Sequence, residues 1–247
     1  MKKILALLLV LSMIFMVSLT ACAPKDEEKE NNEEGNNNNN GDDNKEEEGE
    51  KRTLVFEDDF SSNPLASEDW AVGTGNYTWH ESDGNLEGSG FSYLVNQTVD
   101  QYLKNFVCQV DLFASSEVGT GAMAQMFVRF DNSSSIRLAF NVKTDEIRFA
   151  IYTEGVFNNV TAENFDLDPD IYKLDQWYTM RAVVRDREIS MWIVPKGETI
   201  DETTAPQVTG ALTSSSPLYG AVGILSDNKA LFDNYKVWTI DDVEPVA

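Results

Sequence analysis

The sequence predicts an all-β protein, a sandwich or barrel of about twelve antiparallel strands. From Thr53 onward, short runs alternate apolar and polar residues, which is the pattern of strands with one buried face. Gly, Asn, Asp and Ser interrupt these runs roughly every eight to twelve residues, as in sandwich proteins. Few segments have a helical period, so we expect strands to dominate the fold.

The first 21 residues are predicted to be a signal peptide. Two lysines precede an apolar run from Ile4 to Val17, which is too short for an ordinary membrane-spanning helix. The sequence Leu19-Thr20-Ala21-Cys22 then resembles the lipobox of bacterial lipoproteins, in which the cysteine is acylated and becomes the mature N-terminus. We therefore expect Cys22 to anchor the protein to the extracytoplasmic face of a bacterial cell membrane. The alternative is an ordinary signal peptide with an incidental cysteine.

Residues 22–52 are expected to form a disordered tether. They consist mainly of Glu, Asp, Lys, Asn and Gly, including the run Asn36–Asn40, and contain almost nothing to bury. Random-coil scaling gives about thirty such residues a reach of roughly 30 Å. The tether would therefore hold a folded domain, residues 53–247, clear of the membrane.

Charge and cysteine content narrow the chemistry further. The formal net charge is −23, and a chain this acidic is repelled by phosphate backbones, so we expect no nucleic-acid partner. Apart from Cys22, the only cysteine is Cys108, so the domain has no internal disulfide. Cys108 lies in the apolar run Phe106–Phe113, where a buried structural thiol is expected.

The predicted strands follow one another with short turns between them. Hairpin turns are expected at Asp131–Ser134, Lys143–Asp145 and Asp186-Arg187. Residues 158–175 lack periodicity and are predicted to be a long loop. The strands are Leu54–Phe60, Trp79–Ser82, Asn85–Glu87, Tyr93–Asn96, Phe106–Ala114, Ala122–Phe130, Ile136–Val142, Glu146–Tyr152, Trp177–Arg185, Glu188–Val194, Ala221–Leu225 and Ala230–Ile240.

The first and last strands are expected to lie side by side. TLVFEDDF at Thr53–Phe60 and ALFDNYKVW at Ala230–Trp238 both combine core aromatic residues with carboxylates. A strand this close to the C-terminus has to pair with a segment much earlier in the chain. Pairing these two would close the sandwich and gather acidic side chains where they meet.

Alternation along the central hairpins predicts one polar outer face. In Ala122–Phe130, the side expected to face the core holds Ala124, Met126, Val128 and Phe130. The other side of this strand and of its successors is expected to face outward in a single sheet. It carries Gln125, Arg129, Arg137, Asn141, Arg148, Tyr152 and Trp192.

The order of several short motifs resembles that of the concanavalin A-like lectin/glucanase superfamily. Its relatives include laminin-G-type domains, family-16 glycoside hydrolases and 3-keto-disaccharide hydrolases. The resemblance covers residues 53–240 and implies a two-sheet antiparallel jelly-roll sandwich. The motifs are VFEDDFS (55–61), SDGNLEG (82–88), NFVCQVDL (105–112), MFVRF (126–130), YGAVGIL (219–225) and ALFDNYKVW.

The resemblance also implies a structural calcium ion. Family-16 enzymes often hold one between the opening strand, a glycine of the strand after it, and an aspartate of the closing strand. The matching residues are Asp59 (or Asp58), Gly84 and Asp233, which could supply the oxygen ligands that Ca²⁺ prefers. The alternative is that these carboxylates only terminate strands.

Two further features bear on activity. The Glu-x-Asp-x-x-Glu strand of family-16 catalysis is absent from every predicted strand, so no pair of catalytic carboxylates is identified. The single histidine, His80, has no visible partner for metal or nucleophilic chemistry. The outer polar face, by contrast, matches the concave face on which relatives bind glycans.

We therefore expect a cell-surface lipoprotein that captures carbohydrate through Gln125, Arg129, Asn141, Arg148, Tyr152 and Trp192. Aromatic rings would stack on sugars, and planar polar groups would bind the hydroxyls. One alternative is a glycoside-acting hydrolase similar to the 3-keto-disaccharide hydrolases, with Glu81, Asp83 or Glu154 as the acid. Another is a structural or adhesion module without a small ligand.

Overall fold

The computed structural model describes residues 50–118, 122–130, 135–143, 146–154, 165–168, 170–212 and 217–241. Side chains at 118, 122, 135, 141–143, 146–154 and 165–166 lie outside that description. So do the predicted signal peptide, Cys22, most of the tether, and the turns at 131–134 and 144–145. No helix in the described part is long and apolar enough to cross a membrane.

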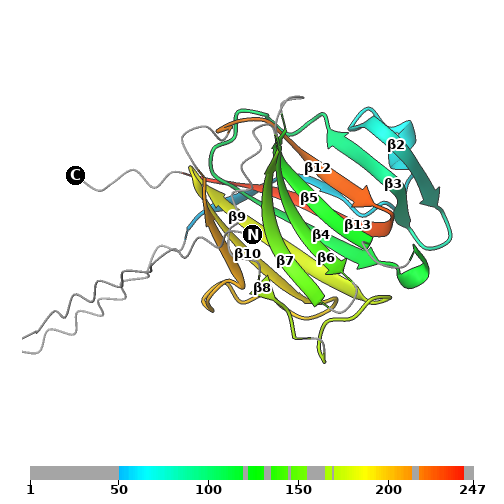
Figure 1. The fold of residues 1–247 in the computed structure, drawn as a ribbon. Helices are drawn as coiled ribbons and strands as arrows, with labels where there is room; N and C mark the ends of the chain where they lie inside the picture. Colours follow the sequence, from blue (N-terminus) through cyan, green and yellow to red (C-terminus); the bar gives the residue numbers. More distant parts are fainter. Residues whose placement is uncertain are drawn as a thin grey trace, which may run out of the picture. The chain divides into compact units, whose positions relative to one another are not determined.

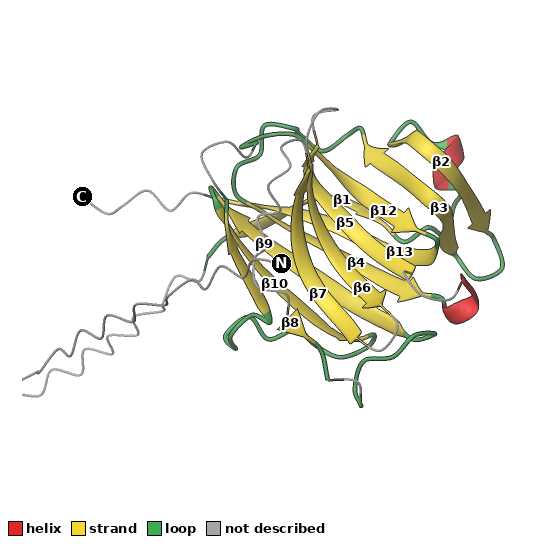
Figure 2. Ribbon diagram, viewed as in Figure 1, coloured by secondary structure: helices red, strands yellow, loops and turns green. Residues whose placement is uncertain are grey.

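The described residues form thirteen strands and two short 3₁₀ turns, η1 (Pro64–Ala66) and η2 (Ser116–Val118) (Figure 2). The strands are β1 (Arg52–Asp58), β2 (Trp70–His80), β3 (Asn85–Asn96), β4 (Phe106–Ala114), β5 (Ala122–Phe130), β6 (Ser135–Lys143), β7 (Glu146–Glu154), β8 (Phe165–Asp166), β9 (Trp177–Arg185), β10 (Glu188–Pro195), β11 (Val208–Ala211), β12 (Ala221–Asp227) and β13 (Lys229–Ile240).

These strands make one antiparallel sheet that folds over into two layers. One layer holds β1, β13, β4, β9, β10 and β11, and the other holds β2, β3, β12, β5, β6, β7 and β8. Strand β3 joins them, because Leu86 pairs with Phe232 of β13 while Val95 pairs with Gly223 of β12. Figure 1 shows β5, β6 and β7 in front of β4, β9 and β10. The predicted all-β jelly-roll sandwich is confirmed.

The first and last strands pair as predicted. Strand β1 runs antiparallel to β13, from Arg52 opposite Ile240 to Asp58 opposite Tyr235. Strand β13 also pairs with β4 on its other side, so the C-terminal strand lies inside its layer. The two-residue turn at Asp186-Arg187 is confirmed as well, since Arg185 and Glu188 are paired across it.

The prediction is wrong for the extent of two strands, because both contain glycines. Strand β2 begins at Trp70, nine residues before the predicted start, because Gly73 and Gly75 resemble a turn in the sequence. The segments predicted at 85–87 and 93–96 are one strand, β3, which runs through Gly88 and Gly90. Position 88 requires a glycine, because a Cβ there would lie 2.4 Å from the Ser226 hydroxyl oxygen of β12. At this point β3 passes from one layer to the other.

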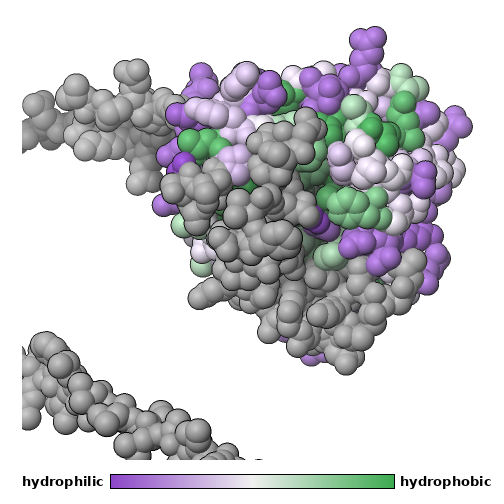
Figure 3. Space-filling view, turned by 45° about the horizontal axis from the view of Figure 1, so that its top comes forward, coloured by the Kyte–Doolittle hydropathy of each residue, from purple (hydrophilic) through white to green (hydrophobic). Residues whose placement is uncertain are grey.

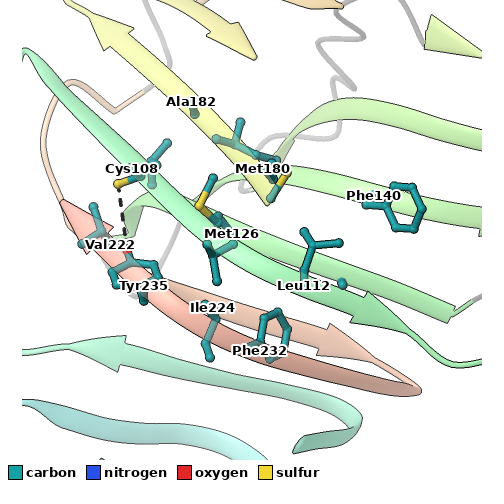
Figure 4. Close-up of a cluster of buried hydrophobic side chains, with 14 of the residues drawn as sticks. Cys108, Leu112, Met126, Phe140, Met180, Ala182, Val222, Ile224, Phe232 and Tyr235 are labelled. Atoms are coloured by element: carbon teal, nitrogen blue, oxygen red, sulfur yellow. Dashed lines mark hydrogen bonds between the residues drawn. The ribbon is translucent and has the colours of Figure 1, made fainter. Parts of the chain in front are cut away.

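Both layers contribute to the main core (Figure 4). Met126 and Ile224 from one layer pack with Met180 and Phe232 from the other, all fully buried. Cys108 is fully buried with its sulfur 3.9 Å from the Tyr235 hydroxyl oxygen, and burial raises the pKa of the thiol to about 12. The expected structural role of Cys108 is thus confirmed, because a thiol with this pKa is not a nucleophile at neutral pH.

Candidate functional site

The structure separates the residues that were predicted to share one outer face. Gln125 and Arg129 lie on β5, whereas Trp192 lies on β10 in the other layer. Trp192 is 7% exposed and packs with Val107 and Ile200, and its indole nitrogen donates to the Thr204 carbonyl oxygen at 3.3 Å. The expectation of an exposed stacking platform at Trp192 is therefore corrected, because the segment after β10 folds back over it.

Three of the predicted ligand residues have side chains outside the description. Asn141 of β6 is opposite Arg148 of β7, and Tyr152 of β7 is opposite Arg137 of β6. The backbone thus brings Asn141 and Arg148 together as one cross-strand pair. A role for these three side chains in glycan binding stays a prediction.

The outer surface of β3, β12 and β5 is apolar where it is described. Val95, Phe127 and Leu225 form a small outer cluster, with Tyr93 and Phe130 against it. Gln125 is 1% exposed, so it does not offer an open polar contact as expected. Beside this cluster, Phe91 is 48% exposed, and its ring centroid lies 5.6 Å from the guanidinium carbon of Arg137. This face is therefore a packed surface with one exposed aromatic ring.

A β-bulge explains why the side chains at the end of β5 point to the opposite faces from those predicted. Phe127 pairs with Gly223 and Phe130 with Ala221, so β5 holds one residue more than β12 between these two pairs. Arg129 lies within that interval with φ +56°, a conformation rare for residues other than glycine. The extra residue reverses the alternation. Phe130 consequently lies on the outer face, 5.3 Å from Phe127 between ring centroids, and not in the core.

Arg129 is completely buried, which corrects the expectation of an exposed sugar ligand. Its guanidinium donates to three backbone carbonyl oxygens, those of Lys104 at 3.0 Å, Pro217 at 3.4 Å, and Asp186. Burial lowers the pKa of Arg129 to about 10, so the group remains protonated at neutral pH. Arg129 thus fastens three separate loops at one end of the sandwich.

Two of these loops carry exposed tyrosines, which we call the tyrosine pair. Tyr102 is 66% exposed and Tyr219 is 39% exposed, and their ring centroids are 5.9 Å apart at an interplanar angle of 62°. The loops also bind each other directly, because the Gly220 amide donates to the Gln101 carbonyl oxygen at 2.7 Å. The ammonium nitrogen of Lys104 lies 5.9 Å from the Tyr219 ring centroid. The pair is therefore held by backbone contacts beneath it.

A polar cleft of about 390 Å³ adjoins the tyrosine pair, and we call it the end cleft. It lies where β3 ends and β12 begins. These strand ends are toward the top of Figure 1, and Figure 3 turns the top forward, where hydrophobic and hydrophilic residues lie side by side. The residues lining it are mostly amides, hydroxyls and acids: Asn96, Gln97, Thr98, Val99, Asp100, Gln101, Tyr102 and Ala221.

Asn96 forms the floor of the loop that lines the end cleft. Its Oδ1 atom accepts from the Val99 amide at 2.8 Å and from the amide and hydroxyl of Thr98, both at 3.1 Å. Its Nδ2 atom is buried without a hydrogen-bond partner among the residues that the structure describes. The side chain therefore fixes the loop conformation and keeps one donor unused.

The three residues predicted to bind calcium each have other close neighbours in the structure. Asp233 lies 2.7 Å from the ammonium nitrogen of Lys196, whereas Asp59 accepts from the Ser61 amide at 3.0 Å and Gly84 packs beside Phe60 and Ser61. No three His, Cys, Asp or Glu side chains of the described part are grouped to hold a metal. The Asp233 and Asp59 carboxylates thus have nitrogen donors in this arrangement, and Ca²⁺ binding at the three residues stays a prediction.

Asp58, the alternative calcium ligand, also accepts hydrogen bonds. Its carboxylate accepts from the Trp70 indole nitrogen and from the Phe60 amide, both at 2.8 Å, and burial raises its pKa. The open cleft beside Asp58 and Asp59 is lined by Asn234 and not by Asp233. The opening and closing strands meet here as predicted, and the Asp58 carboxylate accepts hydrogen bonds where they meet.

Two of the acids considered for hydrolysis, Glu81 and Asp83, lie in the turn after β2. Asp83 lines a cleft with His80, whose Nε2 atom is 3.2 Å from Glu87 Oε2. Lys229 occupies the same cleft, 2.8 Å from a Glu117 carboxylate oxygen. Glu81 is exposed in the turn after β2, and the side chain of Glu154 is outside the description. The contacts described at this cleft are surface ion pairs, which are weak and structural.

A comparison with protein-family models gives no match, and neither does a comparison with the sequences of curated proteins. Solved structures with a similar fold include the carbohydrate-binding module CBM66 from Bacillus subtilis (14% identity, TM-score 0.52, covering 68% of this chain and 94% of that one). A Bacillus subtilis protein of unknown function with a galectin-like fold has 13% identity and a TM-score of 0.55, over 78% of this chain and all of its own length. A β-1,3-glucanase from Mycobacterium marinum has 14% identity and a TM-score of 0.52, over 75% and 99% of the two chains. At these identities the likeness establishes the fold alone.

Proposed function

We propose that the protein binds carbohydrate, with the tyrosine pair and the end cleft as its binding site. One observation carries the proposal. Two exposed aromatic rings, on loops joined by backbone hydrogen bonds, lie beside a cleft lined by amides and hydroxyls. A soluble domain that exposes large aromatic side chains next to converging polar groups is typical of a ligand site. Other aromatic rings of the described residues, such as Phe106, Phe140 and Phe232, lie in the core.

The chemistry of the site suits sugars. A sugar ring presents a face of C–H groups that packs on an aromatic ring, while its hydroxyls both donate and accept hydrogen bonds. Gln97 and Gln101 carry amides that can do either, whereas the buried Asn96 side chain shapes the loop beneath them. The tyrosines would supply contact area, and the amides would fix the orientation of the ligand.

The similar structures support this class of ligand. One is named as a carbohydrate-binding module and another as a β-1,3-glucanase, and both share the jelly-roll fold with this chain. Fold likeness alone does not establish function, since one fold hosts many activities. The proposal therefore depends on the exposed tyrosines of this chain and treats the neighbours as support.

The sequence supports a location for this activity. Residues 1–21 and Cys22 have the features of a lipoprotein signal, and residues 23–52 those of a hydrophilic tether. We propose that the protein is lipid-anchored on the extracytoplasmic face of a bacterial membrane and displays the end cleft toward surrounding glycans. Growth with labelled palmitate would label the wild type, and Cys22→Ser would abolish the label if Cys22 carries the lipid.

Affinity electrophoresis through gels that contain plant, host and cell-wall polysaccharides tests the proposed binding. We expect at least one polysaccharide to retard the protein, and Tyr102→Ala or Tyr219→Ala to weaken binding roughly tenfold each, since a favourable aromatic contact contributes about 1.4 kcal/mol. Phe91→Ala, a truncation of an exposed aromatic on the outer face of β3, is the matched control and should bind normally. Absence of retardation in every gel, or loss of binding only in the control, would refute the proposal.

A further inference from the structure

We infer that the end cleft takes single, uncharged polysaccharide chains, and excludes both polyanionic glycans and flat crystalline surfaces. The inference rests on the proposed function and concerns the class of ligand. Three independent features of the described residues support it: the angle between the two tyrosine rings, the charge around the cleft, and the kind of polar groups that line it.

The angle between the rings argues against a flat ligand. The planes of Tyr102 and Tyr219 are inclined by 62°, so the two rings cannot both lie flat on one planar surface. Their centroids are only 5.9 Å apart, close enough to meet neighbouring parts of one chain. A chain that turns between successive sugars would present one face to each ring. A crystalline array of parallel chains could not lie flat on one ring, because the other ring, inclined to it, would prevent close contact.

Backbone contacts fix the positions from which the two rings extend. Arg129 donates to carbonyls two residues from each tyrosine, at Lys104 and at Pro217, and Gly220 donates to Gln101 between the loops. Moving the two tyrosines apart would require these contacts to break, and in the structure the two rings meet edge to face. The site is therefore preorganised for a turned ligand, and preorganisation favours one geometry over others.

The charge around the cleft argues against acidic sugars. The protein has a formal net charge of −23, which repels polyanions at long range. Among the residues described as lining the cleft, the one ionisable acid is Asp100, and none is a lysine or arginine. Arg129 is unavailable to a ligand, because it is buried and donates to backbone carbonyls. Lys104 alone, above Tyr219, would not neutralise a chain of carboxylates.

The polar lining suits hydroxyl groups. The exposed residues Gln97, Thr98 and Gln101 carry neutral amides or hydroxyls. Such groups exchange hydrogen bonds with uncharged hydroxyls. No charge is desolvated on either side, so the desolvation free energy of the contact is small. Asp100 Oδ1 accepts from the Tyr102 amide at 2.9 Å, so this acid is partly engaged in shaping the loop.

Three kinds of polysaccharide separate this inference from the proposed function. The full mature chain is tested against soluble uncharged chains (linear β-1,3-glucan, galactan and levan), soluble polyuronates (alginate and polygalacturonate), and crystalline cellulose. We expect retention by at least one uncharged soluble chain, a reduction of about a hundredfold in the Tyr102→Ala/Tyr219→Ala double variant, and no retention by the other two kinds. The runs are repeated at high salt to show whether any polyuronate binding is electrostatic.

Each outcome decides something. Retention by polyuronates or cellulose, abolished in the double variant, would overturn the inferred ligand class and leave carbohydrate binding at the tyrosine pair intact. Absence of retention by all three kinds would overturn the proposed function together with the inference. Retention by uncharged chains that is unchanged in the double variant would place binding elsewhere and overturn the assignment of the site.

Discussion

The guanidinium of Arg129 lies 3.0 Å from the backbone carbonyl oxygen of Lys104, which is two residues from the most exposed tyrosine of the described surface. A fully buried positive charge thus supports the part of the surface best suited to binding. The carbonyl oxygens of Pro217 and Asp186 complete the arrangement, so one side chain links the loops after β3, after β9 and before β12. Arg129 is a positioning residue and not a ligand.

Replacing Arg129 by alanine should therefore reduce both stability and binding. The change leaves three carbonyl oxygens without their donor in a buried place, at a cost of about 1–3 kcal/mol for each unsatisfied group. We expect urea unfolding to show a loss of about 3 kcal/mol or more. Arg185→Ala is the matched control, since Arg185 makes an exposed ion pair with Glu50 and its loss should cost less than about 1 kcal/mol.

Arg129→Lys distinguishes positioning from charge. Lysine keeps the positive charge, but its single ammonium cannot reach carbonyls in three directions as the planar guanidinium does. We expect the lysine variant to fold with intermediate stability and to bind glycan more weakly than the wild type under conditions where it is fully folded. Normal affinity in the folded lysine variant would show that Arg129 has no part in presenting the tyrosine pair.

Gly220 offers a second test of the same support. Its φ is +144°, and a Cβ there would lie 2.3 Å from the Arg129 carbonyl carbon, so an alanine has to displace backbone. We expect Gly220→Ala to lower the free energy of unfolding by about 2 kcal/mol or more. Gly197→Ala is the matched control. Its φ is also positive, at +99°, but nothing lies within 4 Å of the added atom, so only strain of about 1–2 kcal/mol is expected.

The architecture could be predicted from the sequence because the main core follows simple alternation. Ala124, Met126 and Val128 are buried in the core as predicted, and β1 pairs with β13 as predicted. Both depend on local pattern and on the need to bury apolar faces. Strand β3 was divided in two because Gly88 and Gly90 resemble a turn, although the close approach of β12 is what requires Gly88.

The candidate site could not be predicted in the same way, because it depends on contacts between distant segments. Nothing near Arg129 in the sequence marks a bulge, and one extra residue moved Phe130 to the outer face. Trp192 has the alternation of an exposed residue, but Ile200 and its neighbours cover it. Tyr102 and Tyr219 are 117 positions apart by their numbers and become neighbours only through the loops that Arg129 joins. The available signal was weak: a tyrosine within a polar segment in each case.

Stability should depend on pH through Glu202. Its carboxylate accepts hydrogen bonds from Arg52 at 2.7 Å and from Arg181 at 2.8 Å, and these donors, Arg52 first, hold its pKa below the usual value. A carboxyl with a lowered folded-state pKa contributes stability above its unfolded pKa of about 4.5, and that contribution is lost as pH falls through the folded value. We expect urea unfolding between pH 7 and pH 3 to show this loss, and Glu202→Gln to reduce the pH dependence while lowering stability at pH 7. An unchanged pH profile in the variant would contradict the assignment.

Lys196 should make the fold independent of calcium. Its ammonium lies 2.7 Å from an Asp233 carboxylate oxygen and 3.2 Å from one of Asp111, and these two aspartates face each other across β13 and β4. An ammonium there supplies the positive charge that a metal ion would otherwise supply between two carboxylates. We expect the melting temperature of the wild type to be the same in EDTA and in millimolar CaCl₂.

Removing that ammonium should expose the repulsion between the two aspartates. Lys196→Met leaves the largely buried Asp111 beside Asp233 without a counter-charge, and we expect it to cost about 2–4 kcal/mol. Millimolar Ca²⁺ should restore part of that loss in the variant and have no effect on the wild type, because only the variant offers two unneutralised carboxylates to a cation. Lys236→Met is the control, since Lys236 makes a looser pair with the exposed Glu57 at 3.4 Å and should lose little stability with or without calcium. A wild-type melting temperature that rises with CaCl₂ and falls with EDTA would instead establish a metal site that Lys196 does not replace.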